Sequence, residues 1–188
     1  MGKKRNNAFG EDLVQSARLA VRLCEQCGRE GLSSRAEGIY RQADAHYAAC
    51  CRRAERAFVT PIDRGDLLAL QTAFLRLSRE LWLLAMTEAE GGAAVRTEEL
   101  RALCRWLEGA AAAWSPLGTR TDRPLSYLQK ALAAADQGTL AAVGRRGAGG
   151  VAGRPARLPQ PSALRLESVL RLGWETAVLF RRIMIQNE

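Results

Sequence analysis

A proline-centred break between two long amphipathic segments, at residues 58–64, constrains this chain more than any other feature. Pro61 lacks a backbone donor and biases the residue before it away from helical conformations, so a preceding helix must end there. Asp63 suits an N-cap position, and the segment after it repeats apolar residues at three- and four-residue spacing. The pattern therefore predicts helices over 34–58 and 64–88, joined by a turn.

The same periodicity, interrupted by glycine, serine and proline, predicts four more helices. They span residues 9–27, 98–114, 125–143 and 162–185. A Gly/Pro/Arg-rich stretch at 144–161 has no periodicity, and we expect it to be a flexible loop. No strand-like alternation rises above background. The sequence therefore predicts an all-α fold with a three-helix bundle in residues 1–90 and a second in 91–188.

Composition and charge restrict the location and the partners. The chain is 47% hydrophobic and 26% charged, values typical of a soluble globular protein. Its basic start is not followed by an apolar run, and no segment is long and apolar enough to span a membrane. We therefore expect a cytoplasmic protein. The net charge of +8 favours an anionic partner. Nearly all the basic residues are arginine, as a GC-rich genome also produces, so a plain basic surface is favoured over nucleic-acid binding.

Five cysteines without a secretory signal argue against a disulfide framework. Cys24 and Cys27 form a C-x-x-C pair, which suggests zinc or redox chemistry. Further ligands would have to come from His46, Cys50 or Cys51. In an antiparallel hairpin of the first two helices, the residue opposite Cys24 lies about nine positions before His46, or roughly 13 Å away. This distance excludes a shared site within the hairpin, so small reduced thiols are the favoured interpretation.

No motif in the sequence indicates an enzyme or a cofactor. The single histidine, His46, lies on an alanine-rich helix without the partner spacing of a catalytic base, and we interpret it as an ordinary polar residue. Serine-nucleophile signatures, phosphate-binding glycine loops and paired catalytic carboxylates are absent. The four tryptophans lie at apolar helical positions and are expected to face the core or a partner.

The break at 58–64 resembles the corresponding junction of the PhoU-like family of phosphate-transport regulators. That family typically has Phe-x-Thr-Pro-(Phe/Ile)-Asp-Arg-Glu-Asp-Ile here, and this chain differs at Gly65 and, conservatively, at Leu67. The matching junction residues are Thr60, Pro61, Asp63, Arg64 and Asp66. Other stretches in register are Ala43-Asp44, Ala135-Asp136, Leu166-Glu167 and the closing segment 183–187.

The resemblance implies a PhoU-like fold of two three-helix bundles in one elongated unit. It also implies a non-enzymatic regulator or accessory protein of inorganic phosphate transport, of the kind paired with Pit transporters. Its partner would be a phosphate transporter or a signalling protein at the inner face of the membrane. Association of the chain with copies of itself, as a homo-oligomer, is a second kind of partnership that we consider. The alternatives are a basic helical nucleic-acid-binding protein and a helical scaffold that dimerises through its tryptophan-bearing faces.

Members of the wider family bind iron or other multinuclear metal sites through Glu/Asp-x-x-x-Asp clusters. This chain keeps three acidic remnants of these clusters, at Asp44, Asp136 and Glu167. The acidic partners at related positions are replaced by Tyr40, Leu132, Arg76, Arg79 and Arg171. Because several ligands become cations, we predict a metal-free protein. The three arginines would pair with the remnant acids or hold an anion such as phosphate; the alternative is that they are solvated surface residues.

Overall fold

The computed structural model describes residues 2–27, 33–57, 60, 62–90, 98–114 and 161–186. Its regular elements are all helices, which confirms the predicted all-α class. They are α1 (Gly2–Cys24), α2 (Ser33–Arg56), α3 (Arg64–Ala89), α4 (Glu98–Trp114) and α6 (Pro161–Gln186). The predicted helix over 125–143 lies outside the described residues, and so does the predicted loop over 144–161 except for Pro161, which begins α6 instead.

Four of the predicted helices begin and end within two residues of the observed helices. The first helix starts earlier than predicted. It begins at Gly2 instead of residue 9 and gives way to a turn at residues 25–27. The prediction began at the first apolar residue, Phe9, whereas helical backbone extends through the polar residues before it. Periodicity marks where a helix buries a face, and this need not be where its backbone begins.

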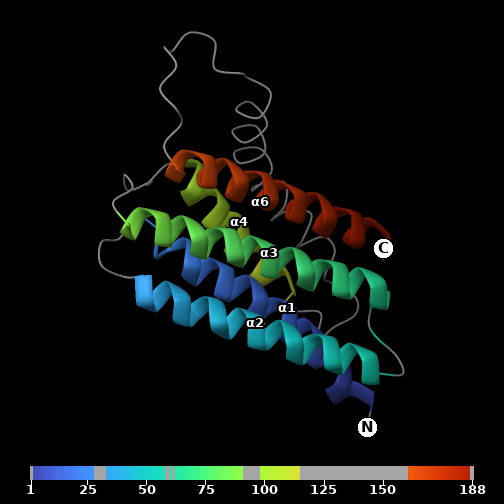
Figure 1. The fold of residues 1–188 in the computed structure, drawn as a ribbon. Helices are drawn as coiled ribbons and strands as arrows, with labels where there is room; N and C mark the ends of the chain where they lie inside the picture. The colour runs from blue at the N-terminus through green and yellow to red at the C-terminus, as the bar shows by residue number, and fades with distance from the viewer. Residues whose placement is uncertain are drawn as a thin grey trace.

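Helices α1, α2 and α3 pack against one another, while α4 lies against α1 and α6 lies along α3 (Figure 1). A single hydrophobic core joins all five helices. Its fully buried large side chains include Leu13 and Leu23 of α1, Phe74 and Leu81 of α3, Leu107 of α4 and Phe180 of α6. The division into bundles at 1–90 and 91–188 stays a prediction.

After the break in the chain, α3 begins with Asp63 as its N-cap residue. The Asp63 carboxylate accepts hydrogen bonds from the backbone N–H groups of Gly65 at 2.7 Å and Asp66 at 3.2 Å, which confirms the predicted N-cap. The Thr60 hydroxyl donates to the backbone carbonyl of Ile62 at 2.6 Å, and the Ile62 side chain is buried. These contacts connect the α2–α3 turn to the core.

Helix α6 is attached to α3 by ion pairs and to α4 by aromatic packing. Arg165 lies 3.2 Å from Glu80, and Arg182 lies 3.6 Å from Asp66, so α6 runs antiparallel to α3. On α4, Trp106 meets Phe180 edge to face, with ring centroids 6.2 Å apart. None of the described helices is long and apolar enough to cross a membrane.

Candidate functional site

Among the residues that the structure describes, the remnant acids and the arginines of the family pattern lie apart from one another. Asp44 is exposed on α2 and Glu167 is exposed on α6, while Asp136 lies outside the described residues. Arg171 pairs with Glu175, one turn further along α6, at 3.3 Å. Arg76 and Arg79 are exposed on α3, and neither has an ion-pair partner within the described part of the chain.

The two described remnants do not by themselves make a multinuclear metal centre of the family type, and the predicted loss of that centre stays a prediction. Such a centre needs several carboxylates close together, whereas the described remnants, Asp44 and Glu167, are exposed on different helices. In the described ranges, only one group of three or more metal-ligating side chains lies close enough to share an ion. That group is Asp12, His46 and Cys50, at the interface between α1 and α2.

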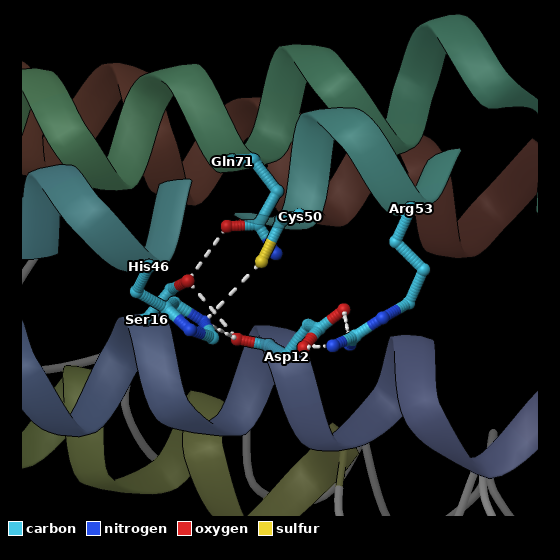
Figure 2. Close-up of polar contacts among 6 residues, drawn as sticks. All are labelled: Asp12, Ser16, His46, Cys50, Arg53 and Gln71. Carbon is cyan, nitrogen blue, oxygen red and sulfur yellow. Dashed lines mark hydrogen bonds and ion pairs between the residues drawn. The ribbon is translucent and has the colours of Figure 1, made fainter. Parts of the chain in front are cut away.

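Six polar residues at this interface form what we call the α1–α2 polar cluster (Figure 2). Helical spacing places them on facing surfaces, since residues three, four or seven positions apart share one face of a helix. The members are Asp12 and Ser16 from α1, His46, Cys50 and Arg53 from α2, and Gln71 from α3.

Asp12 is the buried anion of the cluster. It is only 5% exposed, and a buried carboxylate needs a charged or hydrogen-bonding partner. Nη1 of Arg53 donates to both carboxylate oxygens. The Arg53 side chain is 45% exposed, so this pair extends from the helix interface to solvent. Arg53 thereby neutralises the charge that Asp12 brings into the bundle.

His46 connects the backbone of α1 to the thiol of Cys50. Its Nε2 lies 2.9 Å from the backbone carbonyl oxygen of Asp12 and 3.4 Å from the Cys50 sulfur. Because a carbonyl oxygen only accepts, the first contact assigns the ring proton to Nε2. Burial raises the pKa of the Cys50 thiol to about 12; the Asp12 carboxylate adds to the shift and Arg53 opposes it.

The inner side of the cluster borders a small cavity of about 10 Å³. The Ser16 hydroxyl lies 3.0 Å from the Asp12 carbonyl and 2.6 Å from Oε1 of Gln71, and it donates to one of them at a time. Gln71 is 2% exposed, and its Nε2 has no hydrogen-bond partner in the described structure. The volume suits one water molecule, which would satisfy this amide.

A thiol, an imidazole and a carboxylate in contact resemble a nucleophilic triad, but the contacts differ from one. In a triad the two ring nitrogens face different partners, the nucleophile and the carboxylate. Here one nitrogen, Nε2, meets both the Cys50 sulfur and a backbone carbonyl, and Arg53 engages the carboxylate. With its pKa raised, the Cys50 thiol also stays protonated near neutral pH, so it is not an activated nucleophile.

The C-x-x-C pair lies elsewhere, near the C-terminal end of α1. The Cys24 thiol donates to the backbone carbonyl of Leu100 on α4 at 3.5 Å, and the Cys27 thiol lies 3.6 Å from the carbonyl of Leu81 on α3. A hydrogen bond with Cys104 and burial raise the pKa of Cys24, and burial raises that of Cys27. All five cysteines are free thiols.

Comparison with family models gives no match, and comparison with curated protein sequences gives none either. Among solved structures, the chain is similar to a PhoU-like protein from Shewanella oneidensis MR-1. The two share 13% sequence identity with a TM-score of 0.59, over 97% of this chain and 93% of the other. At this identity the likeness establishes the fold: the chain has a PhoU-like helical fold.

Proposed function

We propose that the protein is a non-enzymatic regulator or accessory protein of inorganic phosphate transport, acting in the cytoplasm at the inner face of the membrane. The observation that carries the proposal is the PhoU-like fold, which extends over nearly the whole chain. The N-cap of α3 at Asp63 lies in the stretch that resembles the family junction, and it supports the proposed relation to phosphate-transport regulators.

The outer face of α6 is the surface that we propose for docking on the transporter. The exposed large apolar side chains of the described residues all lie on this helix, at Leu164, Trp174 and Val178. Trp174 and Val178 are one turn apart, and the exposed Arg171 precedes them by one turn. Aromatic and aliphatic side chains on an exposed helix face, beside the Arg171–Glu175 ion pair, have the composition that protein–protein interfaces favour.

Uptake of radiolabelled phosphate tests the proposal in cells that express a phosphate transporter with or without this protein. We expect the protein to change the uptake rate and to co-purify with the transporter from membranes. The double substitution W174E/V178E should remove both effects, whereas A45E, which adds charge at an exposed site of α2, should keep them.

Unchanged uptake and no co-purification would overturn the proposal. Salt-sensitive binding to DNA in the same preparations would favour the nucleic-acid alternative, since phosphate contacts weaken steeply as salt rises. The net charge of +8 makes this measurement a necessary comparison.

A further inference from the structure

We propose that Asp12, His46 and Cys50 form a binding site for a divalent cation of borderline softness, with Zn²⁺ as the best-matched ion. Imidazole nitrogen, thiolate sulfur and carboxylate oxygen are the ligands that zinc takes in proteins. Calcium and magnesium prefer oxygen ligands throughout, so the donor set argues against both. The proposal stands apart from the role in phosphate transport.

The distances between the donor atoms fit one ion. The ligand atoms of the three residues all lie within 4.8 Å of one another, and the His46 nitrogen lies 3.4 Å from the Cys50 sulfur. Tetrahedral zinc, with bonds of about 2.0 Å to nitrogen and 2.3 Å to sulfur, separates these two ligands by about 3.5 Å. His46 and Cys50 occupy consecutive turns of α2, so the helix already holds two ligands at the required spacing.

A bound divalent ion could take over from Arg53 the role of neutralising the Asp12 carboxylate, because the charges at the site sum to zero in both states. In the ion-free protein, the Asp12 carboxylate, the Arg53 guanidinium and the neutral Cys50 thiol sum to zero. A divalent ion with the carboxylate and the thiolate also sums to zero, without Arg53. The half-exposed Arg53 side chain can then turn to solvent, which opens the outer side of the site.

Binding of the ion requires two protons to move, one on Cys50 and one on His46. The thiol proton of Cys50 leaves to solvent as the sulfur binds the ion. The ring proton of His46 moves from Nε2 to Nδ1, so that Nε2 can act as the ligand and the imidazole stays neutral. The Asp12 backbone carbonyl oxygen, 2.9 Å from Nε2, faces the same side of the ring, so this oxygen or a water molecule would take the fourth position.

Titration of the reduced full-length protein with Co²⁺ tests the site, because a cobalt–thiolate bond gives a charge-transfer absorption band. We expect one Co²⁺ per chain, a band that saturates, and its loss when Zn²⁺ is added. C50S should lose the band. The matched control is C51S, which removes the neighbouring, half-buried thiol and should keep it.

Two further variants distinguish ligand loss from unfolding. H46Q removes a direct ligand and should weaken Co²⁺ binding by at least the roughly 10- to 100-fold that losing a ligand's hydrogen-bond partner costs, while far-ultraviolet circular dichroism stays helical. R53Q should tighten binding by about tenfold, because a competing cation is gone from Asp12. A missing band in the wild-type protein, a band that persists in C50S, or R53Q binding no more tightly than wild type would each overturn the proposal.

Discussion

Asp12 on α1 and Arg53 on α2 form a buried-to-surface ion pair in which one guanidinium nitrogen serves both carboxylate oxygens. The carboxylate end is buried and the guanidinium end is half exposed. Removing the cation would leave the anion unpaired inside the bundle, which costs far more than losing a solvent-exposed pair. The pair therefore holds α1 against α2 mainly by preventing an uncompensated buried charge.

R53Q should accordingly lower the free energy of unfolding of the metal-free protein by about 1–3 kcal/mol. The matched control is R41Q, which breaks the exposed pair of Arg41 with Glu37 on the same helix and should cost no more than about 0.5 kcal/mol. Urea denaturation of both variants with a chelator present measures the difference. Equal losses would show that the Asp12–Arg53 pair behaves as a surface pair.

Loss of the cap at Asp63 should weaken the start of α3. D63A removes the acceptor for the backbone N–H groups of Gly65 and Asp66, and should lower the free energy of unfolding by about 1 kcal/mol. D44A, at an exposed position inside α2, should stay within about 0.5 kcal/mol of wild type. Chemical denaturation checks both values, and a D63A protein as stable as D44A would contradict the capping role.

Phe180 attaches α6 to the rest of the core. Its side chain is fully buried against Trp106, so F180A should create a cavity and cost about 3–5 kcal/mol. V178A, two residues earlier on the exposed face of α6, should change stability by less than about 0.5 kcal/mol. Thermal and urea unfolding provide the measurement. A small loss in F180A would mean that α6 contributes little to the fold.

Alkaline pH should destabilise the fold through the buried thiols. The pKa of Cys27 is raised in the folded protein above the ordinary value of 9.0, so the folded thiol keeps its proton while the unfolded one loses it. The stabilisation is complete below pH 9 and falls as pH rises above it, by about 1.4 kcal/mol per pH unit for each such thiol. Urea denaturation between pH 8 and pH 10.5 should show this fall, with a shallower slope in C27A. Parallel slopes would rule out this contribution from Cys27.

Local chemistry explains why the helix bounds around the junction could be predicted. Pro61 and Asp63 act within a few residues of their own positions, so their effect is readable without knowing what packs on what. The placement of α4 and α6 is different, because it depends on contacts such as that of Arg165 with Glu80, 85 residues apart. Periodicity identifies a buried face but not the helix that covers it.

The α1–α2 polar cluster was missed although the sequence contained a signal for it. Cys24 and Cys27 form the conspicuous ligand motif of the sequence, and their register in the hairpin excludes His46 as a shared ligand. The same register places Asp12 opposite a residue about three positions beyond His46, between it and Cys50. A buried charge on α1 facing a His-x-x-x-Cys turn on α2 was therefore derivable, whereas the part played by Arg53 required side-chain positions.

The hydrophobic core that all five described helices share determines how the protein unfolds. Helix α1 is covered by α4 near Cys24, and α3 is covered by α6 from Asp66 to Glu80, so neither can lose its cover without exposing apolar surface. A chain that ended after α3 would expose the apolar surfaces of α1 and α3 that α4 and α6 normally cover. A separate fragment that contains α4 and α6 should bind to these surfaces. Because the five described helices share one core, we expect them to unfold together in a single cooperative transition.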